Sequence, residues 1–353
     1  MCIRDSYLHL FLDSLDEGRL EMKRLHYDLQ RFVSQLPIDR LYLRVSCRSA
    51  ELPVNFVDLM KDIWQGDDQR KQVQVYTLAQ LRQRDAYQAA IQHPNIDADA
   101  FIDTIKQFGI EAFAAYPVTL VDMLFRIFEA RPNDLPTSRG EIYRQGCREL
   151  ASEISTSRRD DRHIGQFTTE TRLEAARQIA ALSLVGNRPR ISKRFMPDDT
   201  ALLLQDCFLR EANIWSEPEH LLDETLDTAL FAASGNYRIW SHRSYGEYLA
   251  AEYIDQAHMP LQQVQNLFIN PVDPDKRISP KLYEVAAWLA TMSDDIFDWI
   301  FHAEPWILIK SDSIQLTIEQ KTLLIDQFIQ RYNTDGIIAV SYTHLTLPTN
   351  REV

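Results

Sequence analysis

Three acidic side chains follow an apolar run near the start of the chain, in a pattern that suits catalysis. The run YLHLFLDSLDEG, residues 7–18, ends in Asp13, Asp16 and Glu17. A continuous apolar run is typical of a strand that is buried on both faces of a parallel sheet. Ligands of such sheets bind just beyond the carboxyl ends of the strands. The pattern therefore predicts a Mg²⁺-nucleotide site, with Asp13 holding the metal and Asp16 and Glu17 near the attacking water.

A second predicted strand adds a basic residue to the same edge. The segment RLYLRVSCRS, residues 40–49, places Arg48 at its carboxyl end. A guanidinium there can bind a γ-phosphate in fork geometry. Simpler explanations remain open for both features. Acids are favoured in the first turn of a helix by its dipole, and an arginine at a strand end often only faces solvent.

The elements that position these residues read as a strand-helix-strand unit. Apolar residues at helical spacing between Leu25 and Leu36 predict a helix that Pro37 closes. Its length between two strands fits a right-handed crossover. A third short strand is predicted at Val73–Tyr76, followed by a helix that Thr77 caps and that runs to about Ile91.

The remainder of the chain is predicted to be helical apart from one hairpin. Pro117 opens one helix, and Ser138 with Glu141 forms a capping-box signature for another that ends near Leu150. The dipeptide Gly235-Asn236 predicts a hairpin over residues 230–242, and Ser244 is expected to cap the helix after it. The other predicted helices span residues 169–185, 198–211, 221–231, 261–268, 280–291, 294–302 and 317–332.

Composition narrows the class of protein. The chain has 45% hydrophobic residues and only 10 glycines, which favours a helical, well-packed fold. A net charge of −13 disfavours nucleic acid as a partner. No apolar stretch approaches the ~20 residues that span a bilayer, so we expect a cytoplasmic protein without membrane contact. The scattered Cys47, Cys147 and Cys207 are expected to be reduced thiols.

Both ends of the chain look foreign. Residues 1–6, MCIRDS, and residues 340–349, VSYTHLTLPT, match translations of the two strands of a sequencing adapter. Such segments are excluded from fold reasoning. We therefore expect the native part to be Tyr7–Ala339, a metagenomic fragment of a longer gene.

Several segments together resemble one family. FLDSLDEG followed by VSCRSAELP resembles the Walker B and sensor region of NACHT-type STAND ATPases, a class of P-loop NTPases. YPVTLVDMLFRIF (residues 116–128) and LPTSRGEIYRQGCREL (135–150) are similar to that family's helical domain. IWSHRSYGEYLAAEYI (239–254) is similar to its winged-helix signature. The resemblance covers roughly residues 7–254.

The resemblance implies roles for two further residues. Pro117 maps to a proline that packs near the adenine, and His242 maps to a histidine that contacts the β-phosphate. A histidine beside a hairpin is otherwise more often structural. Trp240 departs mildly from the family pattern. The larger departure is the phosphate loop, because no G-x-x-x-x-G-K-[ST] sequence is present.

The expected fold is mainly α with a truncated parallel α/β sheet. It comprises the end of a P-loop NTPase core, a helical domain, a winged-helix-like domain and the start of an α-solenoid. The expected boundaries are 7–92 for the core, 93–157 for the helical domain, 158–257 for the winged-helix-like domain and 258–339 for the helical repeats, with adapter at 1–6 and 340–353.

The function implied by the resemblance is a nucleotide switch for signal transduction. ATP, ADP and Mg²⁺ are the expected ligands, and exchange of ADP for ATP would open the protein and let it form a homo-oligomer in response to an unknown trigger. Many prokaryotic relatives serve in antiviral defence. The parent protein is expected to be an ATPase, and the chain as printed to be nearly inactive without its phosphate loop. Two alternatives remain: a helical scaffold with a decayed nucleotide site, and an AAA+-like DNA-handling ATPase.

Overall fold

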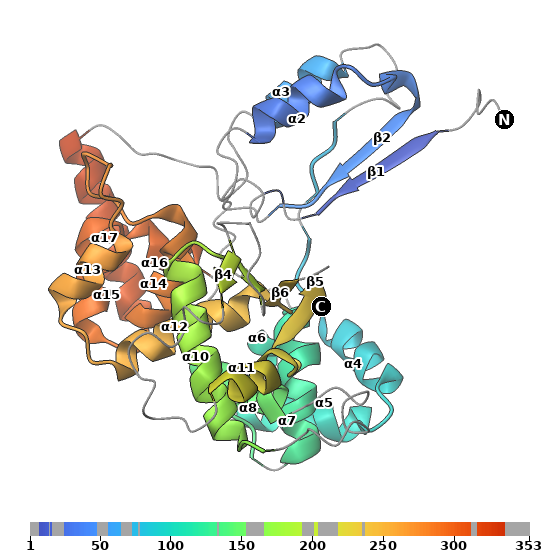
Figure 1. The fold of residues 1–353 in the computed structure, drawn as a ribbon, viewed down its shortest axis with the longest axis vertical. Helices are drawn as coiled ribbons and strands as arrows, with labels where there is room; N and C mark the ends of the chain where they lie inside the picture. Colours follow the sequence, from blue (N-terminus) through green and yellow to red (C-terminus); the bar gives the residue numbers. More distant parts are fainter. Residues whose placement is uncertain are drawn as a thin grey trace. The chain divides into compact units, whose positions relative to one another are not determined.

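The computed structural model describes residues 7–13, 15, 25–47, 56–64, 73–76, 78–132, 134–152, 166–192, 201–203, 218–234, 237–311 and 316–335. Within these ranges the chain is mainly helical, with a parallel pair of strands and a small mixed sheet (Figure 1). It divides into two compact units, residues 1–79 with 325–353, and residues 80–324. No helix in the described ranges has the length and apolar character that a membrane span requires.

The first unit contains the predicted strand-helix-strand order. Strands β1 and β2 pair in parallel with Leu8 opposite Leu41 and Leu12 opposite Val45, and helices α2 and α3 lie beside each other (Figure 1). Leu15, Phe56 and Met60 form its buried cluster. Its elements are β1 (Leu8–Leu12), α2 (Leu25–Val33), η1 (Ile38–Arg40), β2 (Leu41–Val45) and α3 (Phe56–Ile63).

The expectation that the first strand is buried on both faces is wrong for this structure. Leu8 and Phe11 of β1 and Tyr42 of β2 are exposed. Among the described residues, the contacts on the face with Phe11 come from the two strands themselves. The His9 and Tyr42 rings stack at 4.8 Å, and the Arg44 guanidinium lies 5.0 Å from the centre of the Phe11 ring. The third strand predicted at Val73–Tyr76 does not form either.

The second unit begins with helices whose ends follow local sequence signals. The Asp97 carboxylate accepts hydrogen bonds from the N–H groups of Asp99 and Ala100, both at 3.0 Å, and so caps α5. Gly109, at φ +67°, ends the same helix. The Ser138 hydroxyl accepts from Glu141 N–H at 3.2 Å, as predicted for α8. These helices are α4 (Gln83–Gln92), α5 (Ala98–Phe108), α6 (Glu111–Ala114), the π-helix η4 (Val118–Leu124), α7 (Phe125–Ala130) and α8 (Arg139–Ser152).

A mixed four-stranded sheet with order β4-β3-β6-β5 follows α10. The hairpin β5–β6 pairs Phe231 with Trp240, which confirms the predicted strands around Gly235-Asn236, although this dipeptide lies outside the described residues. The helix predicted at residues 198–211 is wrong at Ala201–Leu203, which pairs with β3 instead. The elements are α10 (Thr169–Val185), β3 (Arg190–Ser192), β4 (Ala201–Leu203), α11 (Pro218–Leu226), β5 (Phe231–Ser234), β6 (Tyr237–Trp240) and α12 (Arg243–Gln256).

Buried ion pairs join the central helices of this unit. Glu252 of α12 accepts from Arg177 Nε of α10 at 2.7 Å, and both side chains are only 7% exposed. Arg144 of α8 approaches the second oxygen of Glu252 at 3.5 Å. Tyr248 donates to that oxygen at 3.1 Å. Helices α8, α10 and α12 are thereby fixed around one carboxylate.

The last part of the second unit consists of short helices that gather in the orange and red region of Figure 1. Trp288 of α14 is almost completely buried and contacts Tyr143 and Tyr248, so this region shares one core with α8 and α12. The elements are α13 (Leu261–Phe268), η6 (Pro280–Leu282), α14 (Tyr283–Ala290), α15 (Asp294–Ala303), α16 (Trp306–Lys310) and the start of α17 (Ile318–Asp335), which belongs to this unit up to Leu324.

Candidate functional site

In the first unit, the structure places Asp13 directly after β1 and beside the end of β2. Ser46 Oγ donates a hydrogen bond to Asp13 Oδ1. Backbone bonds from Ser46 N–H to Leu12 O and from Leu15 N–H to Ser46 O, both at 2.9 Å, extend the parallel pairing past the strands. A carboxylate and a hydroxyl therefore meet at the carboxyl edge of this sheet, which is the edge where ligands of parallel sheets bind.

The other predicted residues of this edge, Asp16, Glu17 and Arg48, lie outside the described residues. Within the described part, no group of three or more His, Cys, Asp or Glu side chains could hold a metal. Mg²⁺ in nucleotide sites needs only one or two protein carboxylates, because phosphates and waters supply the other oxygens. The oxygen donors of Asp13 and Ser46 fit such a metal.

In the second unit, His242 is the N-cap residue of α12. Its Nδ1 accepts from Ser244 N–H at 3.2 Å and lies 2.7 Å from Ser244 Oγ. The prediction that Ser244 caps this helix is therefore wrong, because the imidazole reaches the free N–H first. Tyr143 OH donates to Ser244 Oγ at 3.2 Å. Because Nδ1 accepts the hydrogen bond from Ser244 N–H, the neutral imidazole carries its proton on Nε2. This is the tautomer whose Nε2 can donate to an anion.

Pro117 precedes a π-helix rather than an ordinary α-helix. The π-helix η4 spans Val118–Leu124 and is continued by α7. Such wide turns are rare and frequently accompany functional sites. Tyr116, just before the proline, accepts a hydrogen bond on its hydroxyl from Gln80 Nε2 at 2.9 Å. Its ring faces the next residue of interest, Arg139.

Arg139 lies among aromatic rings, and no acid among the described residues pairs with it. Its guanidinium carbon is 5.0 Å from the ring centre of Tyr116, 5.8 Å from that of Tyr143 and 6.0 Å from that of Trp288. Its buried Nε has no hydrogen-bond partner, and it forms no ion pair with a described carboxylate. A cation at the first residue of α8 also opposes the helix dipole.

These contacts link the surroundings of Pro117 and His242, the two residues of the second unit that are predicted to contact the nucleotide. Starting next to Pro117, they lead from Tyr116 through Arg139 and Tyr143 to Ser244 and His242. Burial raises the pKa of the Tyr143 hydroxyl, which keeps it a neutral donor in this relay, although the nearby Arg139 opposes that shift. Burial also lowers the pKa of Lys281, whose carbonyl accepts from Arg243 at 3.0 Å, next to His242 in the chain.

Sequence reasoning missed Ser46, Arg139 and the relay through Tyr143 and Ser244. Ser46 stood in the RVSCRS segment beside Arg48, so its position at a strand end was a usable signal. An arginine at the first residue of a helix, two residues after Thr137, also ran against normal helix charge preferences. The grouping of the Tyr116, Tyr143 and Trp288 rings around Arg139 could not be predicted from the sequence, because Trp288 is distant in the chain.

Comparison of the sequence with models of protein families and with curated proteins finds no match.

Proposed function

We propose that this chain is part of a nucleotide-switched ATPase of the NACHT-type STAND class. The observation that carries the proposal is the meeting of Asp13 and Ser46 at the carboxyl edge of the parallel pair β1–β2. In this proposal Asp13 holds Mg²⁺, and Asp16 and Glu17 act on the attacking water. Bound Mg²⁺ would neutralise charge on the phosphates during transfer.

The second unit supplies the contacts that read the nucleotide state. Pro117 would pack near the adenine, and His242 would donate from Nε2 to the β-phosphate. The relay from Tyr143 to His242 supports this role, because it fixes the tautomer that an anion requires. Arg48 would contact the γ-phosphate. The helix and hairpin order of α10, α11, β5–β6 and α12 supports a winged-helix-like domain, and the helices from α13 onward support helical repeats.

The switch itself is a shift between two populations with different contacts to ADP and ATP. Oligomerisation in the ATP state, a cytoplasmic location and a role in prokaryotic antiviral defence belong to the same proposal. The helical scaffold remains the second candidate, because the core of the second unit is continuous without any ligand.

The test measures Mg²⁺-dependent ATP hydrolysis by the whole ATPase of which, in this proposal, the chain is part. Asp13→Asn and Glu17→Ala are expected to abolish most turnover, because they remove the metal ligand and the group near the water. Asp28→Asn, an acid on α2 of the same unit, is the matched control and should leave turnover unchanged. Undiminished turnover in the first two variants overturns their roles, and a natural protein that binds no adenine nucleotide favours the scaffold.

A further inference from the structure

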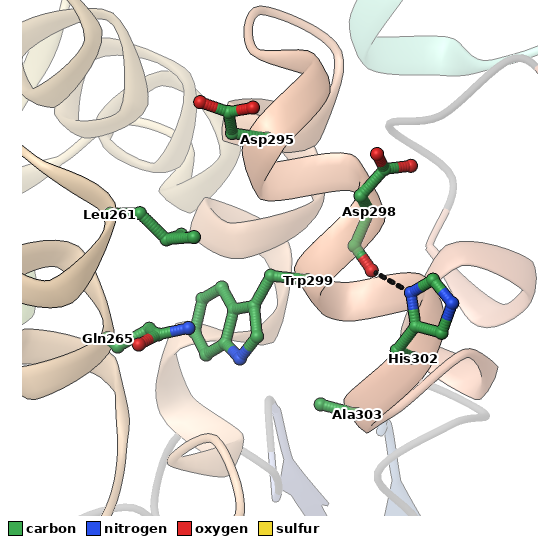
Figure 2. A pocket seen from close by; sticks show the side chains of 7 residues that line it. All are labelled: Leu261, Gln265, Asp295, Asp298, Trp299, His302 and Ala303. Carbon is green, nitrogen blue, oxygen red and sulfur yellow. Dashed lines mark hydrogen bonds between the residues drawn. The ribbon is translucent and has the colours of Figure 1, made fainter.

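A groove between helices α13 and α15 lies outside the proposed nucleotide site (Figure 2). Its volume is about 500 Å³, which is within the range of ~300–1,000 Å³ for ligand pockets. Leu261 and Gln265 line it from α13. Asp295, Asp298, Trp299 and His302 line it from α15.

The apolar part of the groove is an indole ring. Trp299 is partly exposed, and Figure 2 shows its ring beside the side chains of Leu261 and Gln265. Tryptophan attracts cations to its ring face more strongly than the other aromatic residues do. The groove thus combines an apolar contact surface with a preference for positive charge.

The acidic part of the groove comes from two carboxylates one turn apart. Asp295 and Asp298 are exposed and form no ion pair with a described lysine or arginine. Neither α13 nor α15 contains a basic residue other than His302. The helix dipole explains acids in the first turn, such as Asp294 and Asp295. It does not explain Asp298 in the second turn.

His302 shapes the far end of the same face. Its Nδ1 lies 2.7 Å from the carbonyl oxygen of Asp298, to which it donates (Figure 2). This bond holds the imidazole along the helix next to Asp298. Asp295, Asp298 and Trp299 all come from α15 and line the same groove.

We propose that this groove binds an arginine-bearing peptide segment of a partner protein. A guanidinium stacks on an indole face and pairs with carboxylates in fork geometry, and it is less strongly hydrated than an ammonium group. Trp299, Asp295 and Asp298 line the same groove, so it offers a guanidinium both an aromatic ring and carboxylates. The groove then serves as a recognition site for a basic partner in the helical repeats.

Other occupants fit the observations less well. A second copy of this chain is acidic overall, with a net charge of −13, so it complements the acidic groove less well than a basic segment does. For a divalent metal without a phosphate ligand the groove offers two aspartates, and no group of three or more possible ligands occurs among the described residues. The acidic lining likewise repels nucleic acid.

The experiment titrates the complete 353-residue chain with a fluorescently labelled tetra-arginine amide and follows its anisotropy. Tetra-lysine and tetra-glutamate amides are the comparison probes. The wild-type chain should bind tetra-arginine several-fold more tightly than tetra-lysine and should not bind tetra-glutamate. Asp295→Asn with Asp298→Asn should weaken binding at least tenfold, and Trp299→Leu should weaken it several-fold. Added salt should weaken the wild-type complex, because exposed charges are screened.

Asp294→Asn is the matched control, because Asp294 is an exposed acid of the same helix turn that does not line the groove. It should bind like the wild type. Equal loss in Asp294→Asn and in the double variant shows a general acidic surface and overturns the proposal, as does absence of tetra-arginine binding. If sedimentation shows a dimer of the wild-type chain that disappears in the double variant, the occupant is a second copy and the proposal is overturned. Equal affinities of the wild-type chain for tetra-arginine and tetra-lysine overturn the preference for arginine. Circular dichroism confirms that each variant is folded.

Discussion

The two units differ in how completely their apolar surface is buried. In the first unit the cluster around Leu15, Phe56 and Met60 is small, and Phe11 leaves 66% of its surface exposed. In the second unit one continuous core extends from α4 to α17 and encloses Trp288. The proposed metal ligand thus lies in the thinly packed unit, while the proposed β-phosphate contact lies in the densely packed one.

This difference teaches which part of the proposed switch is rigid. Burial of apolar surface is the main favourable contribution to the free energy of folding. The packed core of the second unit can therefore keep the hydrogen bonds from Tyr143 through Ser244 to His242 in place without a ligand. Among the described residues of the first unit the buried cluster is small, and Phe11 and Tyr42 on one face of the parallel pair are exposed. We expect local unfolding to start there, since stability is not uniform across a structure.

The largest effect is expected from the buried charges of the second unit. Glu252→Ala should lower the free energy of unfolding by about 3–5 kcal/mol, because Arg177 is left buried without its closest partner. Urea denaturation followed by circular dichroism measures this. Arg144→Ala is the control: its side chain is 57% exposed, and it should cost at most about 1 kcal/mol. Equal costs for both variants would show that burial does not set the strength of this network.

A core substitution in the first unit, with a smaller expected effect on stability, also tests the comparison of the two units. Met60→Ala should cost about 2–3 kcal/mol through loss of apolar contact in the first unit. Hydrogen exchange should then accelerate at amides of β1, β2 and α3, while those of α10 and α12 keep their protection. Accelerated exchange in both units would mean that they unfold together.

Two glycines of the second unit test how tightly its core is packed. A Cβ on Gly246 would lie 2.9 Å from the Trp240 ring, so Gly246→Ala should destabilise by about 1–3 kcal/mol. A Cβ on Gly140 meets nothing within 4 Å, so Gly140→Ala should be neutral or stabilise by up to ~1 kcal/mol. Thermal unfolding of the two variants measures the difference. A neutral Gly246→Ala would contradict tight packing around Trp240.

The smallest effect concerns how the stability of the helices from α13 onward depends on pH. Burial raises the pKa of Glu304, although the Ile278 N–H that its carboxylate accepts and the charge of Arg277 oppose this shift. A raised pKa favours the protonated form in the folded state. The contribution of Glu304 to the free energy of unfolding is therefore fully present below its unfolded pKa of about 4.3. That contribution is lost as pH rises through the pKa of Glu304 in the folded state. Glu304→Gln should remove this slope from the unfolding free energy, and an unchanged slope would assign it to other groups.

Much of the fold followed from local signals in the sequence. Helix α10 begins after the Thr168 cap and ends at Val185 as predicted, and α13 spans the predicted residues 261–268. In these segments periodicity and caps agree with the tertiary environment. The parallel pairing of β1 with β2 was also predictable, because a single crossover helix separates them.

The misses have tertiary causes. Ala201–Leu203 has an apolar pattern that fits a helix, but pairing with β3 makes it a strand. The apolar residues of β1 predicted two covered faces, yet only one is covered by described elements. For the candidate site, sequence placed Asp13 and His242 but not the contacts to Ser46 and Tyr143, because these depend on how distant segments pack.

The most direct test of the proposed switch is the dissociation rate of ADP from the whole ATPase of which, in the proposal above, this chain is part. His242→Asn keeps an acceptor for Ser244 N–H and so preserves the helix cap, but it removes Nε2. His220→Asn, at an exposed position of α11, is the matched control. Loss of a hydrogen bond to a charged phosphate, about 1.5–3 kcal/mol, should raise the ADP dissociation rate of His242→Asn roughly 10- to 100-fold, with no change in His220→Asn. An unchanged rate in a folded His242→Asn variant would contradict the account.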